Sequence, residues 1–140
     1  MNIKVVHDTE NINWELVSSI LTTAGLSTTE PEICKRAFLG SQITVFVFDD
    51  ENMIGVARAI SDGVKQAAIY DVAILPEYQG KGIGRTIMEN ITDKLSGCNF
   101  ILYANVGKEA FYEKLGFRRL KTGMAKFVKT GQMAERGFTE

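Results

Sequence analysis

The sequence predicts an α/β fold in which a mixed, mostly antiparallel sheet is layered against helices. Segments rich in β-branched and aromatic residues alternate with segments whose apolar residues recur at helical spacing. Three strand-like segments also follow one another directly through short polar turns, which is typical of antiparallel hairpins. The chain of 140 residues is 45% hydrophobic and shows no repeat or linker, so we expect a single domain over residues 1–140.

The first expected elements are a strand and two helices. An apolar run over residues 1–6 predicts the strand. Asn11 or Asn13 is suited to cap the first helix, because a short polar side chain accepts hydrogen bonds from free backbone N–H groups. Thr29 and Glu32 have the spacing of a capping box, which predicts the start of a second, shorter helix.

The later elements are a meander of three strands followed by alternating helices and strands. The three successive strands are expected at residues 43–48, 53–60 and 67–75. A long helix is expected at residues 83–95, then a strand at 100–104 and a last helix that ends at Gly116. Two further strand-like segments lie at residues 117–120 and 124–128.

The most informative segment is the apolar run and glycine loop over residues 67–84. Pro76 stops the apolar run, and Gly80, Gly82 and Gly84 follow before apolar residues recur at helical spacing. Glycines let the backbone approach a ligand closely, and a helix start carries unpaired N–H groups with a partial positive charge. A strand, glycine loop and helix in this order are typical of a phosphate-binding site.

Two common glycine-loop motifs do not fit this segment. A Walker A loop requires Gly-Lys followed by Ser or Thr, whereas Lys81 precedes Gly82 and no hydroxyl residue follows in register. The dinucleotide-binding fingerprint requires glycine or alanine where Arg85 stands, and an acidic residue that residues 100–105 do not supply.

The segment instead resembles the GNAT superfamily of acetyl-CoA-dependent N-acetyltransferases. The signature of that superfamily is Gln/Arg-x-x-Gly-x-Gly/Ala after a strand, and Gln79, Gly82 and Gly84 match every required position. Residues 105–117 resemble the closing helix of the superfamily, with its Asn, its Tyr and its terminal Gly-Phe. Within the superfamily, the chain is similar to compact bacterial enzymes and to plant plastid amine acetyltransferases.

The resemblance implies the GNAT fold, with a sheet splayed between its fourth and fifth strands, and acetyl-CoA (CoA) as the co-substrate without a metal. The pantetheine arm would pair with the backbone of the fourth strand, and the glycine loop would hold the pyrophosphate. The cofactor-binding residues implied in this way are Val72, Ala73, Ile74, Gln79, Gly80, Lys81, Gly82, Ile83, Gly84, Arg85, Asn105 and Tyr112.

Several of these residues have simpler interpretations, which the sequence leaves open. Val72 and Ile74 also fit a buried strand, with or without a ligand. Lys81 and Arg85 also fit solvated surface charges. Asn105 is equally suited to cap the helix that follows it.

The implied catalytic residues are Tyr112 and Asp71. Attack of an amine on an acetyl thioester makes a thiolate, and by family position the Tyr112 phenol would protonate it as the acid; the alternative is a core aromatic. An alkylammonium acceptor has a pKa of about 10.4, so a route for proton removal is needed. Asp71 interrupts an apolar strand and is the candidate base, acting through water; the alternative is a buried Asp that is hydrogen-bonded to a loop or to Tyr70.

The acceptor side of the predicted site is less specified. Arg58 and Asp62 flank a hairpin turn, and Arg58 would either bind a substrate carboxylate or phosphate or form a surface ion pair. Trp14 and Tyr70 are suited to an aromatic wall for an amine, while Trp14 also fits a core anchor. His7 ends the first strand without an evident partner, and no role is assigned to it.

The predicted function is direct acetyl transfer to a primary amine in a ternary complex, with a small molecule as the first candidate acceptor and peptide or protein amines as the second. A CoA-binding sensor without turnover is the alternative from another class. Cys34 and Cys98 lack a candidate activating base, so we expect reduced, structural cysteines and no acyl-enzyme.

The charge and the chain ends give expectations about partners. The chain has 16 basic and 17 acidic residues, and its basic residues form no cluster. We therefore do not expect nucleic acid as a partner. No apolar stretch is long enough for a membrane span or a signal peptide, which predicts a cytoplasmic protein. The polar residues 129–140 form either a flexible tail or an arm onto the second subunit of a homodimer.

Overall fold

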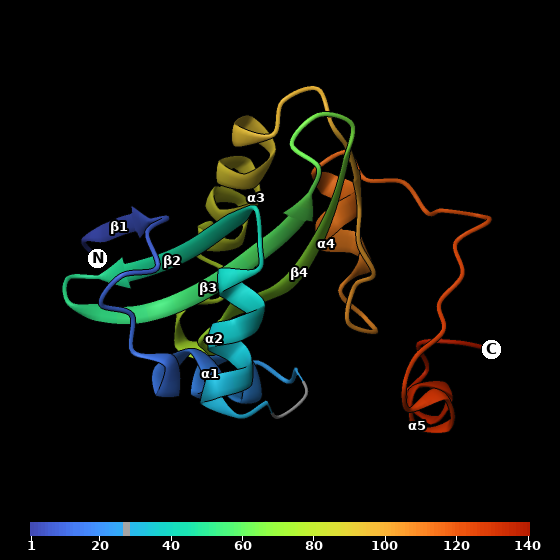
Figure 1. Cartoon of the computed structure of the whole chain (residues 1–140), viewed down its shortest axis with the longest axis horizontal. Coiled ribbons are helices and arrows are strands. Elements are labelled where there is room, and N and C mark those ends of the chain that lie inside the picture. Colours follow the sequence, from blue (N-terminus) through green and yellow to red (C-terminus); the bar gives the residue numbers. More distant parts are fainter. Residues whose placement is uncertain (27–28) are drawn as a thin grey trace. The chain divides into compact units, whose positions relative to one another are not determined.

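Among the described residues, 1–26 and 29–140, a five-stranded sheet with the order β1-β2-β3-β4-β5 organises the first part of the chain (Figure 1). The computed structural model divides the chain into two units, residues 1–102 and 103–140. The strands are β1 (Ile3–Val6), β2 (Ile43–Asp49), β3 (Asn52–Ser61), β4 (Gln66–Ile74) and β5 (Asn99–Ile101). The first four pair antiparallel and β5 is parallel to β4, which confirms the predicted mixed, mostly antiparallel sheet.

Helices cover both faces of this sheet (Figure 1). The helices of the first unit are α1 (Trp14–Thr23), α2 (Pro31–Leu39) and α3 (Ile83–Lys94), with a short 3-10 helix η1 (Pro76–Tyr78) before α3. Phe46 and Val56, which pair across β2 and β3, belong to the apolar core under α1 and α2. Gly55, the neighbour of Val56, faces α3, where a Cβ would lie 3.5 Å from Ile87. Side chains therefore alternate between two apolar layers along β3.

The start of α1 is capped by one of the two expected residues, whereas α2 begins one residue later than the expected capping box would place it. The Asn13 side chain accepts a hydrogen bond from the Leu16 N–H at 3.2 Å. The N-cap of α2 is Glu30, which makes no side-chain cap hydrogen bond, so the box expected from Thr29 and Glu32 was wrong. Pro31 explains the shift, because proline is preorganised for the first helical position and has no N–H that needs a cap.

The two predicted hairpins are confirmed, and an acidic side chain organises the turn of the second one. The β3–β4 turn is closed by Asp62, whose Oδ1 accepts hydrogen bonds from the N–H groups of Val64, Lys65 and Gln66 at 2.8, 2.7 and 3.2 Å. These donors hold the pKa of Asp62 below its ordinary value of 3.8, and the N–H of Lys65 has the largest effect. The turn is thus organised by a carboxyl group whose ionised form the backbone donors favour.

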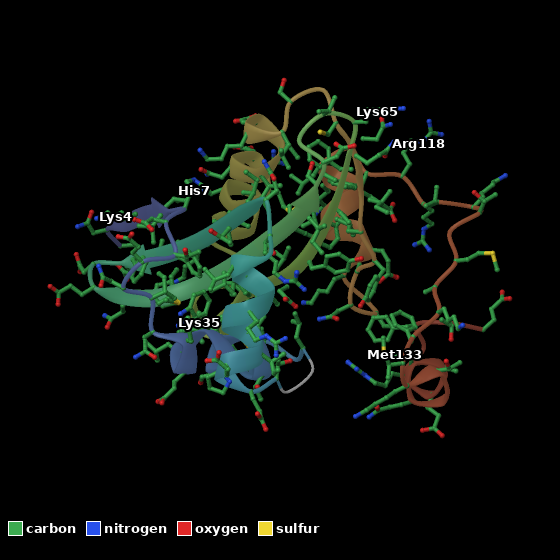
Figure 2. All side chains as sticks on the ribbon, viewed as in Figure 1. Lys4, His7, Lys35, Lys65, Arg118 and Met133 are labelled. Atoms are coloured by element: carbon green, nitrogen blue, oxygen red, sulfur yellow. The ribbon has the colours of Figure 1, made fainter. Side chains whose placement is uncertain are left out.

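His7 has partners that the sequence did not show. Its Nδ1 lies 2.8 Å from the Thr44 carbonyl oxygen and its Nε2 lies 3.2 Å from Asn90 Oδ1. The Thr44 hydroxyl donates in return to the His7 carbonyl at 2.6 Å. His7, labelled in Figure 2, thereby ties the chain after β1 to both β2 and α3.

The sheet opens beside β4. Only Gln66–Ala68 of β4 pair with β5, and among the described residues the rest of β4 has a partner strand on the β3 side alone. The strand expected at residues 100–104 is correspondingly shorter, Asn99–Ile101. The splay predicted between the fourth and fifth strands is confirmed.

The second unit contains α4 (Glu109–Lys114) and α5 (Thr130–Glu135). The strand-like segments 117–120 and 124–128 are not strands, and the side chains of Met124 and Val128 are fully exposed. Strand propensity alone does not form a strand without a partner and a face to bury. The helix α5 was not expected; near it in sequence, Phe127 and Phe138 contact the Tyr103 ring at 5.4 and 5.8 Å.

Candidate active site

The loop between β4 and α3 has an open glycine-lined backbone. Gly80 and Gly82 have φ values of +77° and +84°, which favour glycine, and a Cβ at either position would meet no heavy atom within 4 Å. Gly82 is the N-cap of α3 and provides no capping side chain. The first-turn N–H groups of a twelve-residue helix are therefore left for another acceptor. Ile83 and Gly84, in that turn, are buried.

Side chains of the loop are braced against the first unit. The side-chain amide of Gln79, a predicted cofactor-binding residue, donates a hydrogen bond to the Ile74 carbonyl at 3.0 Å. This bond ties the loop to the last residue of β4. The Tyr78 hydroxyl donates to Asp49 Oδ2 at 2.7 Å. This bond raises the pKa of Tyr78, while the Asn2 N–H and then Tyr78 lower the pKa of Asp49. The bond between Tyr78 and β2 was not foreseen from the sequence.

The two cations of the loop differ in their surroundings. The Lys81 ammonium lies 5.5 Å from the centre of the Tyr78 ring, within the range of a cation–π contact. The Arg85 guanidinium lies 3.5 Å from Glu89 one helical turn away, and both side chains are more than half exposed. The geometry of Arg85 agrees with the surface-charge interpretation, and a contact of either residue with a ligand stays a prediction.

A β-bulge interrupts β4 beside the opening of the sheet. The pairing register shifts between Val56 and Arg58, so one residue of β3 faces two residues of β4, Asp71 and Val72. Asp71 has a φ of +58°, which is uncommon for a residue other than glycine. Of the predicted pantetheine contacts beyond it, Val72 and Ile74 are half-buried and Ala73 is buried. A bulge re-aims the side chain that it carries.

The re-aimed side chain of Asp71 forms an ion pair with Arg58. Arg58 Nε donates to Asp71 Oδ2 at 2.7 Å, and the side chains are 16% and 29% exposed for Arg58 and Asp71. The guanidinium carbon lies 5.3 Å from the centre of the Tyr70 ring and 5.9 Å from that of Phe38. Arg58 also reaches the Ser41 hydroxyl at 3.4 Å. Of the alternatives for Arg58, the ion pair is observed, but it is partly buried rather than on the surface.

The other acceptor-side candidates pack into the first unit. Trp14 contacts the rings of Phe38 and Phe46 at 5.7 and 5.9 Å, as a core anchor does. The Tyr70 ring lies under the Arg58 guanidinium. No hydrogen bond of the described residues joins Asp62 to Arg58, since Asp62 serves its own turn.

Tyr112 and Asn105 belong to the second unit. The Tyr112 ring, on α4, contacts the rings of Phe111 and Phe117 at 4.9 and 5.9 Å. Burial raises the pKa of the Tyr112 phenol above its ordinary value of 10.0, so the group keeps its proton at neutral pH. The N-cap of α4 is Lys108, so the interpretation of Asn105 as the cap was wrong.

The cysteines and acidic groups of the described residues form neither a grouped metal site nor a disulfide. Within residues 1–26 and 29–140, no three or more His, Cys, Asp and Glu side chains group as a metal site would require. Burial raises the pKa of the Cys34 thiol, and neither Cys34 nor Cys98 forms a disulfide. No described helix combines the length and the apolar character that crossing a bilayer demands.

The splayed sheet and the glycine loop at the start of α3 agree with the fold that the resemblance predicts, and the comparisons with known proteins support it. A probable acetyltransferase from meticillin-resistant Staphylococcus aureus has a similar structure, with a TM-score of 0.80 and 27% identity over 91% of this chain and 98% of that chain. The model of the acetyltransferase (GNAT) family matches residues 10–117. The chain belongs to this family, whose members are acetyl-CoA-dependent N-acetyltransferases.

Plant proteins are among the relatives in sequence. Serotonin N-acetyltransferase 2, chloroplastic, of Oryza sativa subsp. japonica is 32% identical over 109 residues, which are 72% of this chain and 54% of that protein. GCN5-related N-acetyltransferase 1, chloroplastic, of Arabidopsis thaliana is 29% identical over 114 residues, which are 78% of this chain and 58% of that protein. The chain thus spans a little over half the length of these two relatives.

Proposed function

We propose that the protein transfers the acetyl group of acetyl-CoA to a primary amine of a small molecule, by direct attack in a ternary complex. The observation that carries this proposal is the order of three features along β4 and the loop that follows it. The bulged Asp71, the part of β4 without a partner strand on the β5 side and the open loop at Gly82 follow one another within twelve residues, counted from 71 to 82. An extended ligand fits this order if its amide groups lie along the open side of β4 and its diphosphate lies at the loop.

The residues present fit this co-substrate. The open side of β4 offers backbone groups from Val72 to Ile74 for the pantetheine amides. The loop offers first-turn N–H groups of α3 beside two positions where no side chain fills the space, Gly80 and Gly82. When bound, acetyl-CoA supplies an activated acetyl thioester, and its diphosphate is the acceptor that the N–H groups of the loop lack.

The chain supplies a proton donor and a proton acceptor for the transfer. By family position, Tyr112 gives its phenolic proton to the sulfur as the carbon–sulfur bond breaks, and its raised pKa supports the protonated form. Asp71 takes the proton that the amine loses as its nitrogen bonds to the acetyl carbon, either directly or through a bridging water. Both roles are proposals, since they rest on the family positions of these two residues.

The choice of a small amine as acceptor rests on one relative. The rice relative is named for serotonin, a small molecule with a primary amine, and that name describes the rice protein alone. The predicted cytoplasmic location and the predicted homodimer stay predictions.

The test measures free thiol released from acetyl-CoA across a panel of small primary amines and short peptides, together with calorimetric binding of CoA. We expect CoA to bind and one or more small amines to release thiol and gain one acetyl group. Binding without any thiol release would indicate a sensor, and release with peptides alone would indicate a protein acetyltransferase. Absence of CoA binding would refute the proposal at its base.

A further inference from the structure

We propose that Arg58 is a positioning residue, which holds the Asp71 carboxylate by one oxygen so that the other receives the ammonium group of the acceptor. The site would then select alkylamines, which are charged at neutral pH, over aromatic amines, which are neutral there. This inference rests on the proposed function and adds the substrate class of its acceptor.

The carboxylate of Asp71 is only half used within the protein. Oδ2 accepts from Arg58 Nε at 2.7 Å, and among residues 1–26 and 29–140 no hydrogen bond to Oδ1 is formed. The side chain is 29% exposed, so this second oxygen is within reach of a ligand. An ionised carboxylate has room for several donors, and an ammonium group brings three.

Arg58 is itself held in place on several sides. Its guanidinium lies against the Tyr70 ring at 5.3 Å and the Phe38 ring at 5.9 Å, and its Nη1 reaches the Ser41 hydroxyl. A planar guanidinium stacks on aromatic rings and donates in fixed directions, which a flexible lysine ammonium does not do. The donor at Nε is therefore fixed by the surrounding core rather than by Asp71 alone.

The backbone of Asp71 points to the same conclusion. A non-glycine residue with φ of +58° inside a strand is strained, and such strain persists where the surroundings determine the conformation. The ion pair with Arg58 is a contact that this conformation permits, because the bulge turns Asp71 toward β3. A carboxylate fixed before the substrate arrives loses little freedom on binding.

The charges also fit a cationic ligand. Asp71 and Arg58 together are neutral, so the site does not repel an ammonium group as an isolated arginine would. The free oxygen presents the negative end of the pair. An aromatic amine, which carries no charge at neutral pH, would gain only an ordinary hydrogen bond at the same oxygen.

The experiment is a double-mutant cycle with two isomeric acceptors, 2-phenylethylamine and 4-ethylaniline. The variants are Arg58→Met, Asp71→Asn and the double substitution, and Arg36→Met on the exposed surface of α2 is the control for the loss of one positive charge. If the panel contains a faster alkylamine, that amine and an arylamine of similar size replace the pair. Calorimetric affinity for CoA reports whether each variant is folded.

We expect each single variant to raise KM for the alkylamine about tenfold or more, because a hydrogen-bonded charge is lost. The double variant should be no worse than Asp71→Asn, since Arg58 acts through Asp71. The KM of the aromatic isomer and the affinity for CoA should change little, while Asp71→Asn should lower kcat for both isomers because it removes the proposed base. Arg36→Met should resemble the wild type.

Three results would overturn the inference while the proposed function stands. They are additive effects of the two substitutions on KM, equal increases in KM for both isomers, and a wild type that acetylates aromatic amines only. A wild type that binds CoA and acetylates no amine would instead remove the proposed function. The two failures are therefore distinguishable.

Discussion

Replacing Gly82 by alanine tests whether the loop backbone holds the diphosphate. The added Cβ meets no protein atom within 4 Å, so a steric clash inside the protein does not occur. The φ of +84° is unfavourable for alanine by about 1–2 kcal/mol, which lowers Tm by about 3–7 °C for a chain of this length. If the Cβ takes the place of the diphosphate, hydrogen bonds to a charged group are lost as well, worth about 1.5–3 kcal/mol, or about 10- to 150-fold in Kd.

Gly25 provides a matched control for the strain. It follows α1, has a φ of +88°, and a Cβ there also meets no atom within 4 Å. Gly25→Ala should lower Tm as Gly82→Ala does and leave the Kd for CoA unchanged. Calorimetric titration with CoA and thermal unfolding of both variants provide the measurements. Equal CoA affinity of the two alanine variants would refute the assignment of the loop, because strain alone would then explain every effect.

The remaining predictions concern single groups. Tyr112→Phe should lower kcat about 100-fold and leave the affinity for CoA unchanged, because only the acid is lost; full turnover would remove its catalytic role. The depressed pKa of Asp62 contributes stability that is present above its ordinary value of 3.8 and lost as the pH falls through the lower folded value. Between about pH 6 and pH 2.5, the Tm of the Asp62→Asn variant should therefore fall less than the Tm of the wild type. An equal fall in Tm for both proteins would contradict this. Buried Cys34, with its raised pKa, should alkylate far more slowly than half-buried Cys98 in peptide mapping after iodoacetamide; the reverse order would show that Cys34 is accessible.

Most of the first unit could be predicted because its signals are local. The hairpins follow from short polar turns between alternating apolar strands, and α3 follows from helical spacing after the glycine loop. The segments 117–120 and 124–128 carry the same residue types and form no strand. The difference lies in partners, because a strand is stabilised by pairing and burial that the segment itself does not encode.

Contacts between distant segments were beyond local patterns. The partners of His7 are 37 and 83 residues away in the chain, and those of the Tyr78 hydroxyl and Arg58 are 29 and 13 residues away. A sequence pattern reports the neighbours of a residue on its own helix or strand. The sequence therefore predicted a position for the candidate site but not which groups hold its side chains.

The bulge at Asp71 shows why even a correctly predicted strand can mislead about its site. The hairpin register places Arg58 opposite Tyr70, and strict alternation from there would point Asp71 to the α3 face, away from Arg58. The bulge reverses the alternation, because Ile69 pairs with Ala59 while Ala73 pairs with Val56 and joins the core under α1 and α2.

Two other non-glycine residues have positive φ, Asn11 and Asp50, and both lie in turns, where such values are common. Asp71 is the one that lies inside a strand among the described residues. A turn residue at positive φ shapes the chain, whereas a strand residue there disrupts pairing and brings no benefit to the sheet. What the strain at Asp71 does bring is a carboxylate turned toward Arg58 at the point where the sheet opens. Backbone strain of this kind is concentrated at functional sites, which supports the proposed contact between Asp71 and the acceptor.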